Sequence, residues 1–113
     1  MPGNDLTWKE FERVEMRVGT VLAAEPFPEA RNPSYRLRID FGEVIGIRKS
    51  SAQITDRYGV EELVGRQVVA VVNFPPKQIA TMRSECLVLG GMEGKVVTLL
   101  RPDFSVANGT RIG

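Results

Sequence analysis

Alternating apolar and polar residues predict β-strands along most of the chain. The most regular alternation sets apolar or aromatic residues against charged ones: Tyr35, Leu37, Ile39 and Phe41 against Arg36, Arg38 and Asp40. A period of two places one set in the core and the other in solvent, as in a half-buried strand. Alternation also predicts strands at 14–24 and 44–51. A continuous apolar run at 68–72 predicts a strand buried on both faces, and 86–89 and 95–100 repeat that pattern. In strand 44–51, Ile45 and Ile47 are expected on one face and Arg48 on the outer, basic face.

Two short helical turns are expected between these strands. Thr7 is followed three residues later by Glu10, which is the spacing of a capping box. The turn that it begins would place Trp8 and Phe11 on one face. A second turn is expected at 60–64, because the chain there continues into a glycine, a common residue after a helix end.

Clusters of proline, glycine and polar residues predict the connections. Loops or turns are expected at 25–33, 42–43, 73–85 and 90–94. The segment 1–7 shows no periodicity and is expected to be a flexible arm. Near the other end, Asn108–Gly109 is expected to turn a small terminal hairpin.

The order of these elements favours a closed antiparallel barrel. About five principal strands with one short helix between the third and the fourth leave no β-α-β spacing. The best fit is an all-β fold, a five-stranded Greek-key OB-fold barrel with short helical turns and N- and C-terminal extensions, forming a single domain over residues 1–113. In this fold the surface of strands two and three usually binds oligonucleotides. Here that surface is expected to carry Arg36, Arg38 and Arg48.

Composition describes an ordinary globular protein and disfavours most catalytic chemistry. The chain has 113 residues, of which 42% are hydrophobic and 26% are charged, as in a typical single domain. No apolar run approaches the roughly 20 residues of a membrane span, so we expect a cytoplasmic protein without membrane insertion. The chain has no histidine and one cysteine, Cys86, which removes most nucleophile pairs and the commonest zinc ligands. We expect no enzyme activity, no metal and no cofactor.

Any binding of anions must depend on local clusters of basic residues, because the formal net charge is only +1. Eleven of the fifteen basic residues are arginines, which favours bidentate phosphate contacts. Arg36 and Arg38 are two residues apart on a predicted strand, so their side chains would point the same way about 7 Å apart. That spacing suits successive phosphates of a nucleic acid. It suits equally well a solvated face balanced by Asp40 and Glu43.

The loop expected after strand 68–72 is a second candidate site. Phe74, Lys77 and Arg83 combine an aromatic ring with cations, which could form a platform for an unstacked base. Alternatively, Phe74, Ile79 and Met82 cover the end of the barrel.

Several segments match one known family in order and spacing. They are VEMRVGTV at 14–21, FPEAR at 27–31, LRIDFG at 37–42, IRKSSAQIT at 47–55, VAVVNFPP at 69–76, SECLVLGG at 84–91 and NGTRIG at 108–113. Together they resemble the stand-alone tRNA-binding domains with an OB fold, and the NFPP ending is similar to that of the CsaA-like secretion chaperones. Many members have glycine and methionine where this chain has Cys86 and Leu87, and a side chain there weakens the transfer of nucleic-acid contacts at this loop.

The resemblance implies a homodimer that binds tRNA and, in the chaperone branch, unfolded or pre-secretory polypeptides, without catalysis. The export machinery is a further expected partner. The positions carried over as tRNA contacts are Arg36, Arg38, Arg48, Ser50, Gln53, Lys77, Ser84 and Glu85. The apolar polypeptide groove, expected at the dimer seam, would be lined by Trp8, Phe11, Phe74, Pro75, Ile79 and Met82. The alternative is a tRNA-binding module or tRNA-structure chaperone without polypeptide chaperone activity.

Overall fold

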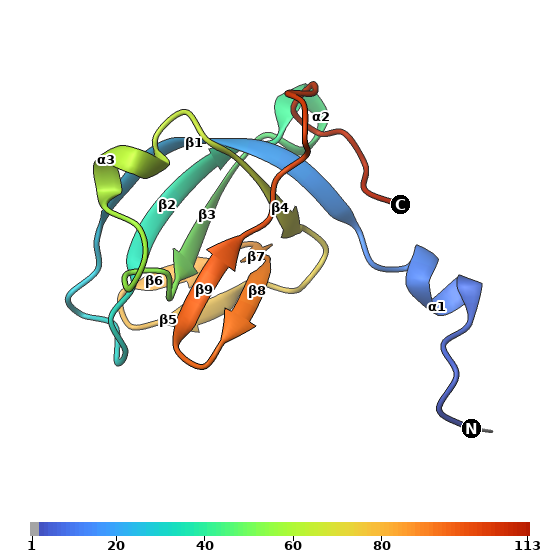
Figure 1. Ribbon diagram of the computed structural model, residues 1–113, viewed down its shortest axis with the longest axis horizontal. Helices are drawn as coiled ribbons and strands as arrows, with labels where there is room; N and C mark the ends of the chain where they lie inside the picture. The colour runs from blue at the N-terminus through green and yellow to red at the C-terminus, as the bar shows by residue number, and fades with distance from the viewer. Residues whose placement is uncertain (1–2) are drawn as a thin grey trace.

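A five-stranded antiparallel sheet curls almost into a barrel in the computed structural model, which describes residues 3–113 (Figure 1). The strands lie in the order β3 (Ile47–Ala52), β2 (Tyr35–Asp40), β1 (Met16–Pro26), β4 (Gln67–Val71) and β7 (Leu87–Val88). Two separate hairpins are formed by β5 (Lys77–Ile79) with β6 (Met82–Ser84) and by β8 (Gly90–Glu93) with β9 (Val96–Leu99). The short helices are α1 (Trp8–Glu12), α2 (Gly42–Ile45) and α3 (Val60–Leu63).

The barrel closes where β3 meets the chain that follows β6. The Glu85 N–H donates to the Lys49 carbonyl oxygen (2.8 Å), and the buried Ser50 hydroxyl donates to the Cys86 carbonyl oxygen (3.0 Å). The Ser51 N–H donates to the Ser84 hydroxyl oxygen (3.1 Å). These bonds join β3, the first strand of the sheet, to residues 84–86, which lead into its last strand, β7. The predicted all-β OB-fold barrel is confirmed.

The core lies inside the curl and follows the predicted alternation of β2. Leu37, Ile39 and Phe41 are buried, whereas Arg38 between them is exposed. Strand β4 is buried along four of its five residues, as its continuous apolar run predicts. The short helix α3 contributes Leu63, which is completely buried.

Gly19 allows β1 to cross closely over β2. A Cβ atom on Gly19 would lie 2.6 Å from a side-chain carbon of Ile39 and 2.7 Å from the ring of Phe41. Real Cβ atoms do not approach other atoms so closely, and packed cores have no spare volume. Glycine at this position therefore permits the curvature of a strand that is eleven residues long.

The terminal segments pack differently from the rest of the barrel. The capping box of α1 is present, with Thr7 and Glu10 exchanging both of its hydrogen bonds, and α1 lies apart from the barrel beyond the start of β1 (Figure 1). Residues 3–7 are exposed and form neither helix nor strand, and residues 1 and 2 of the predicted arm lie outside the described part. No described helix is long and apolar enough to cross a membrane.

The face prediction for β3 is wrong. Arg48 stands opposite Ile39 in the β2–β3 register, and directly opposed residues in a sheet share a face. Ser50 and Ala52 are accordingly buried on that inner face, whereas Ile47 is half exposed. The predicted turn at 42–43 is replaced by helix α2, so the strand begins later than expected.

Three further predictions of local structure are corrected. The expected loop at 73–85 contains the β5–β6 hairpin, which turns at Ala80 with a positive φ of 49°. The expected turn at 90–94 is largely strand β8. The turn at Asn108–Gly109 exists, but no terminal hairpin forms in the described chain, because the tail pairs with β1: the Val18 N–H donates to the Thr110 carbonyl oxygen (2.9 Å), and the Ile112 N–H donates to that of Met16 (2.9 Å).

Candidate nucleic-acid and polypeptide interfaces

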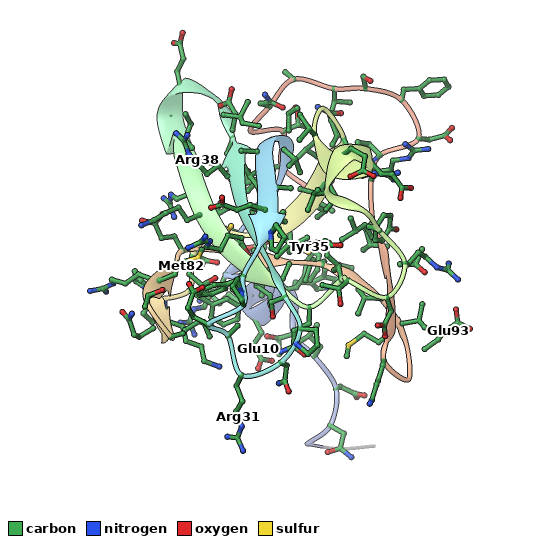
Figure 2. All side chains as sticks on the ribbon, turned by 90° about the vertical axis from the view of Figure 1, so that its left-hand side faces the viewer. Glu10, Arg31, Tyr35, Arg38, Met82 and Glu93 are labelled. Carbon is green, nitrogen blue, oxygen red and sulfur yellow. The ribbon has the colours of Figure 1, made fainter. Side chains whose placement is uncertain are left out.

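Two cations stand side by side on the outer face of the barrel. Arg38 on β2 is directly opposite Lys49 on β3, and both residues are exposed. Among the residues that the structure describes, no carboxylate lies within ion-pair distance of either side chain. Figure 2 shows further nitrogen-tipped side chains on the same flank, between Arg38 and Met82. We call the pair Arg38 and Lys49, with the exposed Lys77 and Arg83 of the β5–β6 hairpin, the basic flank.

Arg36 also points outward, but its guanidinium group is already occupied. Its Nε lies 3.1 Å from a carboxylate oxygen of Glu25, and its Nη1 lies 3.7 Å from one of Glu29. The same group lies 5.1 Å from the centre of the Phe27 ring, in cation–π range. A phosphate would have to displace two carboxylates from Arg36. The alternative given in the sequence analysis, a solvated face on which acidic residues balance the arginines, therefore applies to Arg36, with Glu25 and Glu29 as the acids.

Arg48 does not belong to the outer basic face, which corrects the prediction that it joins Arg36 and Arg38. From the inner face of β3 its Nη1 donates to the Val72 carbonyl oxygen (3.2 Å) and, more weakly, to that of Glu85 (3.4 Å). A charge-assisted bond to two carbonyl groups ties the end of β4 to the segment that closes the barrel.

Three other predicted tRNA contacts take part in barrel closure. Ser50 is buried, Ser84 accepts a bond from β3, and the Glu85 carboxylate accepts one from the Lys49 N–H (3.0 Å). Gln53 and Lys77 are exposed. The eight predicted residues are therefore divided between a structural set and an accessible set; the accessible set is Arg38, Gln53 and Lys77.

The lone thiol belongs to the closure region as well. Cys86 is buried, and burial raises the pKa of its thiol to about 11. A thiol with that pKa stays protonated at neutral pH and packs as a small hydrophobic group. No cluster of three or more histidine, cysteine or acidic residues that could hold a metal occurs in the described part of the chain.

Exposed apolar side chains gather on α1 and on the connection after β4. Trp8 is 83% exposed and Leu6 is 69% exposed, and together with Thr7 and Phe11 they line a small hollow of about 250 Å³. Phe74 is 56% exposed, and Pro75 beside it is also exposed.

Asn73 holds these two apolar regions together. Its side-chain amide donates to the Arg13 carbonyl oxygen (2.6 Å) and accepts from the Glu15 N–H (3.0 Å). The bonds fix the C-terminal end of α1 against the residue that precedes Phe74. We call Trp8, Phe11, Phe74 and Pro75 the apolar arm.

The remaining two groove candidates are less accessible. Met82 is buried, so the prediction that it lines an open groove is wrong for this chain. Its position on β6 turns it inward, while its neighbour Arg83 faces solvent. Ile79 is half buried.

A larger cleft was not predicted from the sequence. It has a volume of about 660 Å³ and lies between the end of β3, residues 53–56 and the segment β7–β9. Gln53 is the one predicted site residue among those that line it. Its walls come from segments distant in the chain, so sequence periodicity carried no signal for it.

The barrel with its outer cations has the architecture of an OB-fold domain. A family model described as "Putative tRNA binding domain" matches residues 16–111. The chain belongs to this tRNA-binding domain family, and within it to the CsaA group.

The solved structures that resemble the chain support this membership. The chaperone CsaA of Bacillus anthracis superposes with a TM-score of 0.92 at 53% identity, covering 96% of this chain and 99% of that one. CsaA of Picrophilus torridus gives a TM-score of 0.91 at 46% identity, with 96% and 100% covered.

Curated relatives include much longer enzymes. The methionine–tRNA ligase of Porphyromonas gingivalis is 34% identical over 109 residues, which is 96% of this chain and 16% of the ligase. That of Leptospira biflexa is 36% identical over 104 residues, or 92% of this chain and 15% of the ligase. The chain thus spans about a sixth of the length of these relatives.

Proposed function

We propose that this chain acts without catalysis as a dimeric, CsaA-like chaperone that binds unfolded or pre-secretory polypeptides and also binds tRNA. The observation that carries the proposal is the end-to-end similarity to two CsaA structures, at 53% and 46% identity. The proposed site of action is the cytoplasm, where clients would pass to the export machinery.

Binding of tRNA is assigned to the basic flank. Arg38 and Lys49 are adjacent across two strands and have no acidic partner in the described chain, so their charge is available to phosphates. A net charge of +1 gives no long-range attraction, and affinity must therefore come from this local cluster. Exposed Gln53 and Lys77 extend the contact.

Polypeptide binding is assigned to the apolar arm. Large exposed rings such as Trp8 and Phe74 bury much surface with little loss of conformational entropy. The arm also supports the proposed dimer, since α1 stands away from the barrel (Figure 1) and its Trp8 is 83% exposed. A second copy packed on α1 would form the two-sided groove that one barrel lacks.

The tRNA assignment is tested by filter binding of total tRNA over a range of salt concentrations. Removing one phosphate contact should reduce the slope of log affinity against log salt by roughly 0.7 to 0.9, so Arg38→Ala and Lys49→Ala should each flatten it. Arg31→Ala removes the same charge from an exposed loop that lies away from Arg38 (Figure 2) and should leave the slope unchanged. Equal slopes for all three variants would exclude the basic flank.

The polypeptide assignment is tested by suppression of aggregation of a chemically unfolded client. Trp8→Ala and Phe74→Ala should suppress aggregation less well than the parent protein at equal melting temperature. Val44→Ala is the matched control, because Val44 is a fully exposed apolar residue on α2. If tRNA binds and no variant or parent protein delays aggregation, the chain is a tRNA-binding module without polypeptide chaperone activity.

A further inference from the structure

Residues on the outer face of the sheet form rows that cross β1, β2 and β3. Residues paired directly in an antiparallel register share a face. One row consists of Ala23, Arg38 and Lys49, and the next row consists of Glu25, Arg36 and Ser51. Two residues along a strand separate these rows, which places them about 7 Å apart. The Arg38 row therefore carries two cations and no acid, whereas the Arg36 row carries one cation opposite one acid.

A second acid reaches the Arg36 row from the loop that follows β1. A carboxylate oxygen of Glu29 lies 3.7 Å from Nη1 of Arg36. The same oxygen lies 3.5 Å from the hydroxyl oxygen of Thr81, in the turn of the β5–β6 hairpin, at the limit of a hydrogen bond. Glu29 thus stands where this loop meets the hairpin. We call Glu25 and Glu29 the acidic border, because they lie beside the basic flank at the Arg36 end of β2.

The acidic border neutralises the charge of Arg36 but does not satisfy its hydrogen-bonding groups. Nε of Arg36 lies 3.1 Å from a carboxylate oxygen of Glu25, yet the buried Nε–H makes no hydrogen bond within the described chain. The 3.7 Å between Nη1 and Glu29 is too long for a hydrogen bond. A guanidinium group binds phosphate well where no acid competes for it. Removal of the two carboxylates would therefore make Arg36 a phosphate site.

Acidic residues stand on both sides of the Arg38 row. On one side lies the acidic border, and on the other side lies Asp40, opposite Thr20 and Ile47 in a row that holds no cation. A phosphate beside Arg36 or Asp40 would stand close to a carboxylate, and like charges repel at such distances. Unfavourable contacts of this kind restrict a ligand to the positions that lack them. On this face, only the Arg38 row has cations without an opposing acid.

We propose that Glu25 and Glu29 determine the path of bound RNA, because they keep phosphates away from Arg36 and confine them to the row of Arg38 and Lys49. The RNA backbone then crosses the strands of the sheet instead of following β2. This inference rests on the proposed binding of tRNA by the basic flank and names the residues that limit it. The two acids lower the affinity for RNA and reduce the number of phosphates that the face binds.

The test measures filter binding of total tRNA to the full chain over a range of salt concentrations. The double variant Glu25→Gln/Glu29→Gln should steepen the slope of log affinity against log salt by roughly 0.7 to 0.9, the contribution of one phosphate contact. For affinities that are equal at 1 M salt, this slope gives roughly five- to eightfold tighter binding at 0.1 M. A gain of affinity on removal of two acids is the result that the acidic border predicts.

A matched control separates this local effect from a change in net charge. The double variant Glu61→Gln/Glu93→Gln removes two negative charges at exposed positions on α3 and on the β8–β9 hairpin. Figure 2 shows Glu93 on the opposite side of the molecule from Arg38. The slope of this control should equal that of the parent protein.

Substitution of Arg36 in both backgrounds shows whether the gain passes through this residue. Arg36→Ala added to Glu25→Gln/Glu29→Gln should abolish the gain in slope, whereas Arg36→Lys, which keeps the charge, should retain most of it. In the parent background Arg36→Ala should change the slope much less, and this difference measures the coupling between Arg36 and the acidic border. Circular dichroism at the assay temperature checks that each variant is folded.

The outcomes distinguish this inference from the proposed function. An unchanged slope for Glu25→Gln/Glu29→Gln, a gain that survives Arg36→Ala, or an equal gain in the control variant would overturn the role of the acidic border. The tRNA assignment would still stand if Arg38→Ala and Lys49→Ala flatten the slope. Failure of the parent protein to bind tRNA would overturn the tRNA function and the acidic border together.

Discussion

Arg36 and Arg38 should behave as two different kinds of residue, although they are two positions apart on one face of β2. Arg36 is held by Glu25, Glu29 and the ring of Phe27, whereas Arg38 has no ion pair within the described residues. We predict that Arg36→Ala lowers stability and that Arg38→Ala leaves it nearly unchanged.

The magnitude follows from the exposure of the partners. Glu25 and Glu29 are 62% and 44% exposed, so each ion pair contributes at most about 0.5 kcal/mol. The contact with the Phe27 ring adds about 0.5 to 1 kcal/mol. The loss on Arg36→Ala is then about 0.5 to 2 kcal/mol, which corresponds to a decrease in Tm of about 2 to 8 °C for a domain of this size. Surface substitutions without such partners stay within about 0.5 kcal/mol.

The assay is thermal unfolding of the parent protein and both variants by circular dichroism, combined with the salt dependence of tRNA binding. Arg38→Ala should flatten the salt dependence at unchanged Tm, and Arg36→Ala should lower Tm with a smaller change in slope. An unchanged Tm for Arg36→Ala, or an equal decrease for Arg38→Ala, would refute the division between a structural and a binding arginine.

Four other outcomes follow from the same structure. Gly19→Ala should destabilise the fold by about 1 to 3 kcal/mol in urea unfolding, because its Cβ would clash with buried Ile39 and Phe41; a neutral effect would show that β1 can shift. Asn73→Ala should increase hydrogen exchange at the end of α1, since it removes the bonds to Arg13 and Glu15, and unchanged exchange would contradict that tether. A hydrogen bond from the Arg17 side chain lowers the pKa of Glu15, so the ionised Glu15 stabilises the fold at pH values above its ordinary pKa range. This stabilisation is lost as the pH falls through the lowered pKa. The Tm of Glu15→Gln should therefore fall less on acidification than that of the parent protein, and parallel curves of Tm against pH for the two proteins would contradict this. Burial raises the pKa of Cys86 to about 11, so at pH 8 a disulfide reagent should modify the native thiol much more slowly than the urea-unfolded thiol, and equal rates would show that the barrel opens there.

Local chemistry made part of the fold predictable from the sequence. The capping box at Thr7 depends on residues three positions apart, and the alternation of β2 depends on a period of two. The buried run of β4 is likewise contained within one segment. In each case the residues that determine the structure are neighbours in the chain.

Long-range pairing explains what was missed. The tail turns at Asn108–Gly109 as predicted, but its partner is β1, about ninety residues away in the sequence. On β3 the isoleucines predict the core face, whereas the inner face carries Arg48 and Ser50, whose side chains bond to the segment that closes the barrel, and the small Ala52. The β5–β6 hairpin turns at Ala80 with a positive φ, which is uncommon for a residue other than glycine.

The candidate site was likewise predictable only where it depends on residues that are close in the sequence. Sequence spacing correctly placed Arg36 and Arg38 on one face, but only the register that sets Glu25 opposite Arg36 reveals that this arginine is engaged. The cleft between β3 and β7 depends on two sheet edges that meet only in the folded chain.

The most direct test of the account maps both ligands on one isotope-labelled sample by amide chemical shifts. We predict that tRNA shifts amides of β2, β3 and the β5–β6 hairpin around the basic flank. An unfolded client should instead shift those of α1 and residues 73–75, which carry the apolar arm. Shifts by tRNA centred on the cleft or the apolar arm, or no response to either ligand, would contradict the account.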